Sequence, residues 1–298
     1  MPSAKKTPEL LSIGELSQAT GISPDTIRVW ERRYGVPEPV RLPSGHRRYT
    51  PEQLRWLRRA AEAISLGHRP GNVVGATEED LQELLDRRRT KVEAPSDVES
   101  WLDLIRSFAS RDLTRLLRED FESMPTAKFL TQTLSPLLIA VGRAWSDGRL
   151  EVRHEHFFSE LLQDLLRSLR VAIGLSGNGP RVLIAAFSNE MHDLPVQMGA
   201  LLAASKGLQP QVLGKDTPID EIARASTEMR CRGVVVPTSL SSSSVELEAY
   251  ASDLRGKLPD HIALCVGWHD ARFMRRAPVG VKLVRELPEL ELWLRSLL

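Results

Sequence analysis

A glutamate and a histidine, Glu190 and His192, follow the apolar run Val182–Ala186 closely. That run has the composition of a buried β-strand, so both side chains are expected just beyond the carboxyl end of a strand. An imidazole placed there suits a transition metal, and a nearby carboxylate can orient the ring. Taken alone, the histidine is better explained as an ordinary loop residue. Only its surroundings make it a candidate ligand.

Arginines gather near the N-terminus, where nine of them and no lysine fall between Arg28 and Arg59. Residues 1–70 carry a net charge of +5 and the remaining residues a net charge of −4, so the overall charge of +1 conceals two modules of opposite sign. A charge run can be a solvated helix face, but guanidinium groups also neutralise phosphates, which makes binding salt-dependent. The pattern favours a basic nucleic-acid-binding module joined to an acidic module with another task.

Composition narrows the class of protein further. The chain has 298 residues, 42% of them hydrophobic, which suffices for two or three domains with packed cores. No run approaches the roughly 20 apolar residues that span a bilayer, and the N-terminus lacks the apolar stretch of a secretory signal. Cys231 and Cys265 are too few for a disulfide framework, and we expect them in the core of a cytoplasmic protein.

Helix and turn signals position the basic residues. Residues 12–19 predict a short helix, and residues 20–21 a tight turn. Ser23 followed by Pro24 is typical of a helix start, and this second helix is expected to end near Arg33. Together they form the helix-turn-helix pattern. Residues 46–49 predict a short extended segment, and a third helix follows from Thr50.

The rest of the chain changes character twice. Residues 97–175 are helical throughout, with breaks near 110–111, 124–125 and 146–150, which predicts about four helices in a small bundle. Beyond residue 180, five β-rich runs alternate with helices, which predicts an α/β domain with a parallel, Rossmann-like (flavodoxin-like) five-stranded sheet. The β-rich runs are Val182–Ala186, Gln211–Leu213, Val234–Val236, Ile262–Val266 and Val281–Val284. The predicted fold is therefore multi-domain: residues 1–75 a winged helix-turn-helix, 76–96 a linker with a short helix, 97–176 a four-helix bundle and 177–298 the Rossmann-like domain.

The first 60 residues or so resemble the winged-helix DNA-binding domain of the MerR family. The residues that carry the resemblance are Ile13-Gly14-Glu15-Leu16, Gly21–Arg28, Trp30-Glu31-Arg32-Arg33-Tyr34-Gly35 and the wing pattern Pro43-x-Gly45-His46-Arg47-x-Tyr49. The resemblance implies a double-stranded DNA operator as partner, with the start of the second helix at base edges and the wing at the backbone or minor groove. The candidate DNA contacts are Ser23, Asp25, Thr26, Arg28, Arg32, Arg33, Arg41, Gly45, His46, Arg47 and Tyr49.

The second half resembles a cobalamin-binding module, whose pattern is E/D-x-H-x-x-G, S/T-x-L and Gly-Gly. Trp145, nine further residues and then Glu155-His156 are similar to the bundle of the CarH-type light-responsive MerR regulators. The resemblance implies adenosylcobalamin as cofactor and chromophore, with His192 as the metal ligand from below and the bundle residues over the upper face. The candidate cofactor-binding residues are Trp145, Glu155, His156, Glu190, His192, Thr238, Ser239, Leu240, Gly267 and Trp268.

Three positions depart from this pattern and leave the ligand open. Pro195 and Trp268 stand where the pattern has glycines, which let a backbone approach the nucleotide tail of cobalamin closely, and Ser146 stands where some light-sensing relatives have a histidine. Cobalamin in an adjusted pose is one interpretation. Another tetrapyrrole, a bilin (biliverdin) or haem, is a second. A ligand-free scaffold that contacts a protein antagonist is the third.

These interpretations share one preferred function, a DNA-binding transcriptional regulator that is not an enzyme. We expect a repressor whose homo-oligomeric state, dimer or tetramer, changes with its chromophore in response to light, as the CarH-type resemblance implies. Joined DNA-binding modules raise the effective concentration, so separating them weakens operator binding. The rival interpretation is a cobalamin-dependent methyltransferase-type enzyme, but no part of the chain is left for a substrate-activating domain.

Overall fold

The computed structural model describes residues 10–20, 22–65, 70–81, 85, 98–174, 178–188, 190, 192–238, 244–267 and 277–298. The chain divides into two compact units. The first unit comprises residues 1–93 with 139–155, and the second comprises residues 94–138 with 156–298. Helices α9 (Ser135–Ser146) and α10 (Val152–Gly174) each contribute residues to both units.

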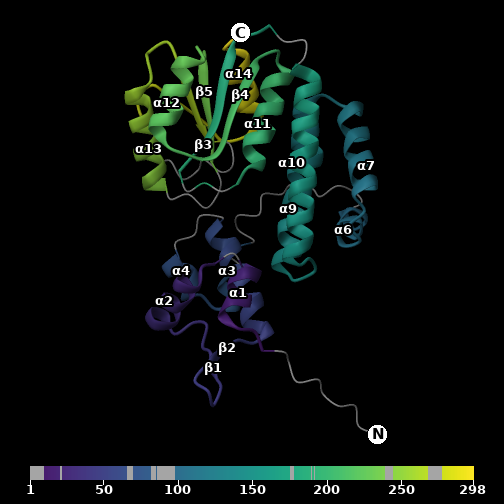
Figure 1. Ribbon diagram of the computed structural model, residues 1–298, viewed down its shortest axis with the longest axis vertical. Coiled ribbons are helices and arrows are strands. Elements are labelled where there is room, and N and C mark those ends of the chain that lie inside the picture. Colours follow the sequence, from purple (N-terminus) through teal and green to yellow (C-terminus); the bar gives the residue numbers. More distant parts are fainter. Residues whose placement is uncertain are drawn as a thin grey trace. The chain divides into compact units, whose positions relative to one another are not determined.

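The first unit opens with α1 (Ile13–Thr20) and α2 (Pro24–Tyr34), the predicted pair of helices (Figure 1). The Oγ of Ser23 accepts a hydrogen bond from the backbone N–H of Thr26 at 3.1 Å, so α2 begins where its capping signal predicts. Gly35 ends the helix with φ of 75°, a left-handed conformation that glycine adopts without strain.

Two short strands, β1 (Val40–Arg41) and β2 (Arg47–Arg48), pair antiparallel and form the wing. Gly45, with φ of 79°, lies in the turn between them. Helices α3 (Pro51–Ser65) and α4 (Pro70–Val74) follow, and apolar side chains from the helices and the end of the wing share one core. That core includes Leu16, Ile27, Trp30, Tyr49, Leu57 and Val73. In the predicted linker helix, residues 78–81 are helical, and much of the linker lies outside the described residues.

The helical region has the breaks that the sequence predicts. It comprises α6 (Val98–Arg106), α7 (Ser110–Ser123), α8 (Thr126–Lys128), the π-helical segment η1 (Phe129–Leu134), α9 and α10. α8, η1 and α9 follow one another without a gap and form one continuous helical segment. With α6, α7 and α10 this gives the four helical segments that the sequence predicts.

The second unit ends in a five-stranded parallel sheet of order β4-β3-β5-β6-β7, which confirms the predicted Rossmann-like fold. Its elements are β3 (Arg181–Phe187), α11 (Leu194–Ser205), β4 (Gln209–Thr217), α12 (Ile219–Glu228), β5 (Gly233–Pro237), α13 (Ser244–Lys257), β6 (Ala263–Gly267), β7 (Val281–Val284) and α14 (Leu287–Arg295). The strand order reverses between β3 and β5, and in such sheets ligands bind beyond the carboxyl ends at that point.

Helices cover both faces of the sheet. α12 and α13 pack on one face, and α11 and α14 on the other (Figure 1). α11 is buried on all sides from Pro195 to Ala204, which makes it the central helix of its layer. Within the described residues, no helix is long and apolar enough to cross a membrane.

Candidate DNA interface and ligand site

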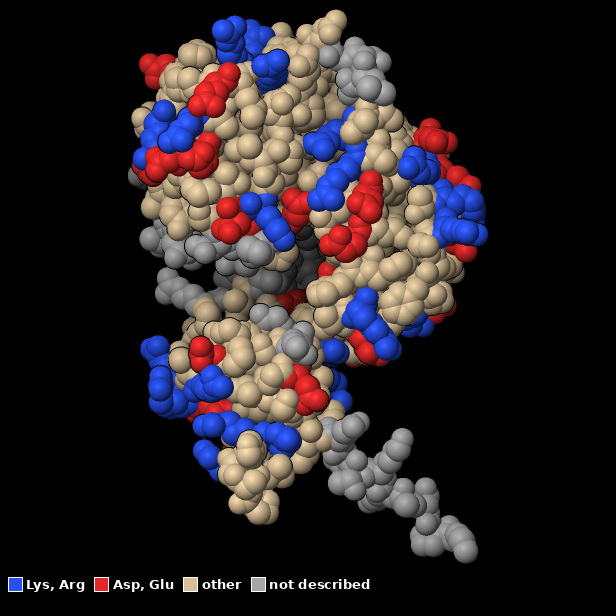
Figure 2. Space-filling model, in the orientation of Figure 1, with Lys and Arg blue, Asp and Glu red and all other residues tan. Residues whose placement is uncertain are grey.

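The predicted DNA contacts lie on α2 and the wing, and most of them are exposed. Figure 2 shows Lys and Arg side chains gathered over this part of the first unit. Thr26 and Arg47 are half-buried, and Tyr49 is buried. The exposed residues of the set are Ser23, Asp25, Arg28, Arg32, Arg33, Arg41, Gly45 and His46.

The first turn of α2 is held by its own side chains. The hydroxyls of Ser23 and Thr26 are 2.8 Å apart, and Ser23 also caps the helix. Both groups thus stabilise the helix start. Arg28, whose side chain is half exposed, donates to Asp25 at 2.6 Å, and this exposed ion pair is weak enough to be exchanged for a phosphate or a base.

One predicted contact, Tyr49, is placed differently from the expectation. Its side chain is fully buried, and its hydroxyl donates to Oε1 of Glu31 on α2. Oε2 of the same glutamate accepts from Nε of Arg47 on β2 at 3.0 Å. Tyr49 therefore joins the wing to α2 from inside the core. Sequence reasoning missed Glu31 as the centre of this network, because it is one of three glutamates among the nine arginines and nothing in the sequence singles it out.

Beyond β3, Glu190 and His192 form a close pair. The carboxylate of Glu190 is buried, with 4% of the side chain exposed, whereas 57% of the His192 side chain is exposed. Oε1 of Glu190 lies 2.6 Å from Nδ1 of His192 and also accepts from the backbone N–H of His192 at 3.0 Å. A carboxylate only accepts, so this contact assigns the proton to Nδ1 and the lone pair to Nε2. That tautomer is the one with which histidine binds a metal through Nε2.

A second polar cluster, missed in the sequence, lies immediately after this pair. Oδ2 of Asp193 accepts from Nη2 of Arg167 on α10 at 2.9 Å and from Nε2 of Gln197 on α11 at 3.1 Å. Oε1 of Gln197 is buried and has no hydrogen-bond partner among the described residues. The only local signal was an acidic residue at a helix start. Arg167 is remote in sequence, so its part could not be predicted.

The remaining candidates on the sheet are partly described. Thr238 is buried and follows β5, the other strand at the reversal of order. Gly267 ends β6 with φ of 116°, a conformation that favours glycine. Ser239, Leu240 and Trp268 lie outside the described residues.

The upper-face candidates lie near the turn between α9 and α10. Trp145 and Glu155 are half-buried and belong to the first unit, whereas His156 is exposed and belongs to the second. The more buried histidine here is His154, whose Nδ1 accepts from the backbone N–H of Glu151 at 3.0 Å. That Trp145, Glu155 and His156 cover the upper face of a ligand stays a prediction.

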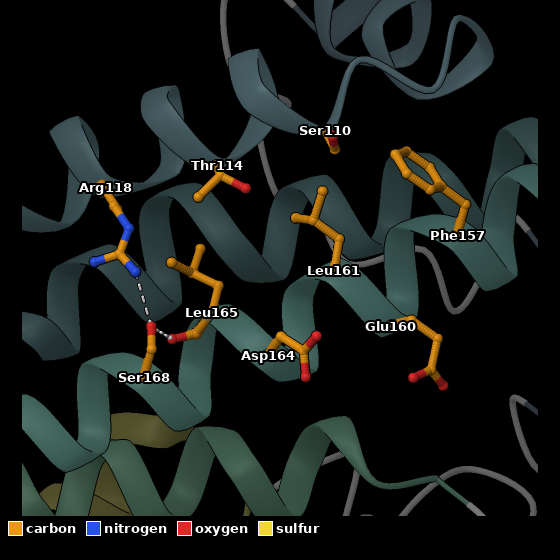
Figure 3. Close-up of a pocket in the computed structure, with 9 residues that line it drawn as sticks. All are labelled: Ser110, Thr114, Arg118, Phe157, Glu160, Leu161, Asp164, Leu165 and Ser168. Atoms are coloured by element: carbon orange, nitrogen blue, oxygen red, sulfur yellow. Dashed lines mark hydrogen bonds between the residues drawn. The ribbon is translucent and has the colours of Figure 1, made fainter.

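A groove of about 500 Å³ runs between α7 and α10, within the second unit. Figure 3 shows Leu161 and Leu165 along it, with Arg118 at one end, where the guanidinium donates to Oγ of Ser168 at 2.9 Å. No predicted cofactor-binding residue lines this groove. It is therefore separate from the site at Glu190 and His192.

Comparisons with known proteins match the N-terminal domain and the helical region to known families. Residues 11–80 match the MerR HTH family of regulatory proteins, and residues 97–170 match the B12 binding domain. The HTH-type transcriptional repressor CarH of Myxococcus xanthus is 29% identical over 263 residues, which are 86% of this chain and 88% of CarH. The chain matches the CarH-type MerR regulators. Its N-terminal domain is similar to the MerR DNA-binding domain, and its helical region is similar to a B12 binding domain. The chain is therefore a DNA-binding regulator.

Two further proteins are similar to this chain, one in sequence and one in fold. The repressor CarA of Myxococcus xanthus is 29% identical over 221 residues, 74% of this chain and 73% of CarA. CarH and CarA are both transcriptional repressors, which supports the interpretation of a regulator rather than an enzyme. The monomethylamine corrinoid protein of Methanosarcina barkeri superposes with a TM-score of 0.52 at 14% identity, over 66% of this chain and 96% of that protein, and shares the fold.

Proposed function

We propose that this CarH-type regulator is a repressor whose DNA binding is controlled by cobalamin, with His192 as the cobalt ligand. The observation that carries the proposal is the pair of Glu190 and His192 at the point where the strand order reverses. The match of the helical region to the B12 binding domain supports the same ligand.

The donor set fits a corrin. A corrin ring supplies four nitrogens to cobalt, so the protein needs to add a single axial ligand. Among the described residues there is no group of three or more His, Cys, Asp or Glu side chains that would hold a bare metal ion. The exposed ring of His192, oriented by a buried carboxylate, is suited to that axial role. The unpartnered Oε1 of Gln197, in the first turns of α11, is a further acceptor that a polar ligand group would satisfy.

The residues of this chain would then divide the work. Glu190 holds the tautomer of His192, and the tie between Asp193 and Arg167 fixes the backbone beside it. Thr238 and Gly267 lie at the carboxyl ends of β5 and β6, on the same side of the sheet as His192. We propose Trp145, Glu155 and His156 for the opposite face of the ligand. Adenosylcobalamin, when bound, supplies a cobalt–carbon bond that light breaks.

We further propose that the ligand acts through homo-oligomerisation. Two linked DNA-binding domains engage neighbouring half-sites with an effective concentration far above that of free copies, which strengthens binding by about 10²–10⁴-fold. Separation of the copies in the light would remove this gain without changing any DNA contact. The expected signature is an oligomer in the dark and a smaller species after illumination, measured by analytical ultracentrifugation of the holoprotein.

The test of the ligand is an absorbance spectrum of the full-length protein, isolated in the dark from cells supplied with adenosylcobalamin. We expect a cobalamin spectrum that changes on illumination. His192→Ala should lose axial ligation, and Glu190→Gln should weaken cobalamin binding by about 10–100-fold, because an outer partner orients the ligand. His261→Ala is the matched control, since that exposed histidine lies on the turn before β6, at the other edge of the sheet.

Other spectra would overturn the choice of ligand. A far-red band after growth with biliverdin would assign the site to a bilin, and an intense band near 400 nm would assign it to haem. A colourless protein after every supplement would refute a chromophore and favour a switch operated by a protein antagonist. Equal spectra for the wild type and His192→Ala would refute the cobalt ligand.

A further inference from the structure

An arginine of the DNA-binding domain, Arg58 on α3, is buried with 7% of its surface exposed. Arginine is seldom buried unless specific groups compensate for the lost hydration of its charge. Arg55, one turn earlier on the same helix, shows the usual state, with 51% of its side chain exposed and a long 3.6 Å pairing with Glu52. Another part of the chain therefore covers Arg58 and leaves Arg55 exposed.

The cover is the turn between α9 and α10, which belongs to the same compact unit as α3. The guanidinium carbon of Arg58 lies 5.6 Å from the centre of the Trp145 ring. Its Nη1 faces Gly148, where a Cβ would lie 3.6 Å away, and its Nε donates to the carbonyl of Ala19 at 3.3 Å. Burial lowers the pKa of Arg58, and the nearby charge of Glu151 partly restores it.

The turn is built to hold this shape. Gly148 has φ of 76°, and its N–H donates to the carbonyl of Trp145 at 3.0 Å. The N–H of Leu150 donates to the carbonyl of Ala144 at 2.9 Å, and the Leu150 side chain is fully buried. These hydrogen bonds close the turn and fix the backbone that carries the indole of Trp145.

We propose that Arg58 is an intramolecular latch that docks the DNA-binding domain on the turn between α9 and α10 through Trp145 and Gly148. A planar guanidinium stacks on an indole face, and such a contact is strengthened when the charge is shielded from water, as that of the buried Arg58 is. Through this contact, a movement of α9 and α10 would change the orientation of the DNA-binding domain. Where Trp145 also covers a ligand, which rests on the proposed function, one indole connects the ligand to Arg58.

The test measures the docking itself, in ligand-free, full-length protein. Spin labels on Glu52→Cys and Arg153→Cys report the separation of α3 from the start of α10 by double electron–electron resonance. Both native cysteines are buried, which protects them from labelling. We expect one narrow distance distribution. Arg58→Ala should lower the ratio of docked to undocked molecules by about 30-fold, which corresponds to about 2 kcal/mol and broadens the distribution.

The controls separate the latch from general damage. Trp145→Leu approaches the contact from the other side and should broaden the distribution as Arg58→Ala does, whereas Arg55→Ala should leave it narrow. A broad distribution in the wild type, or a narrow one in Arg58→Ala and Trp145→Leu, would overturn the latch. Because no cobalamin is added, failure of the proposed ligand leaves this measurement unaffected. A narrow wild-type distribution with a colourless protein would retain the latch and reject the ligand.

Discussion

Replacing Tyr49 by phenylalanine removes one hydroxyl from the core of the DNA-binding domain and changes little else. That hydroxyl donates to Oε1 of Glu31, whose side chain is 9% exposed. Burial raises the pKa of Tyr49 well above its usual range, so the phenol remains a donor at every physiological pH. Tyr49→Phe therefore leaves one oxygen of a buried carboxylate without its donor, while Arg47 still pairs with the other oxygen.

The magnitude follows from the cost of an unsatisfied buried acceptor, about 1–3 kcal/mol. We expect Tyr49→Phe to lower the local free energy of opening by about 2 kcal/mol. This loss corresponds to an increase of about 30-fold in the ratio of open to closed states. Glu31 lies on α2 and Tyr49 follows β2, so the loss should be felt in both the recognition helix and the wing.

Hydrogen exchange of the full-length protein, followed by mass spectrometry, measures this loss locally. Amides in residues 24–34 and 40–49 should exchange about 30-fold faster in Tyr49→Phe, and those of β3 should be unchanged. Tyr34→Phe is the matched control, because Tyr34 is a half-buried tyrosine at the end of α2 whose ring lies near Arg33. Wild-type exchange in Tyr49→Phe, or an equal acceleration in Tyr34→Phe, would refute the network.

Two other perturbations follow from the charges of the chain. Replacing Arg28 and Arg41 together by alanine should reduce the slope of log affinity against log salt for duplex DNA by about 2, because each phosphate contact contributes about 0.9; the exposed Arg224, in the second unit, should have no effect when replaced. Hydrogen bonding from Lys206 at 2.6 Å lowers the pKa of Glu291 below 4.5. The folded state thus gains stability that is present above pH 4.5 and lost as the pH falls through the lowered pKa. In thermal unfolding against pH, Glu291→Gln should remove this part of the acid sensitivity, and an unchanged profile would contradict it.

Local signals were sufficient for most of the fold. The start of α2 followed from Ser23 and Pro24, and the strands β3, β5, β6 and β7 followed from short apolar runs. β4 was predicted over three residues, yet it extends from Gln209 to Thr217. It lies at the edge of the sheet, and its half-exposed polar residues carry little apolar signal.

The sites could be predicted where a motif fixes the backbone and not where packing chooses the partner. Glu190 and His192 follow a strand directly, so their location was readable from the sequence. The wing pattern contained Tyr49 but could not reveal that its ring enters the core. The tie between Arg167 and Asp193 joins residues 26 positions apart on different elements, and no local period or cap encodes it.

Pro195 illustrates how the structure changes the meaning of a departure from a family pattern. It stands where the pattern has a glycine, yet it lies in the first turn of α11, where a missing N–H removes no helical hydrogen bond. His192 lies between Glu190, whose N–H donates to the carbonyl of Phe187 at 3.1 Å, and Asp193, which is hydrogen-bonded to Arg167 on α10. A ligand residue fixed on both sides before binding has less conformational entropy to lose, which favours affinity. Pro195 at the start of α11 is therefore compatible with the histidine site that we propose, even though it lacks the freedom that a glycine would give.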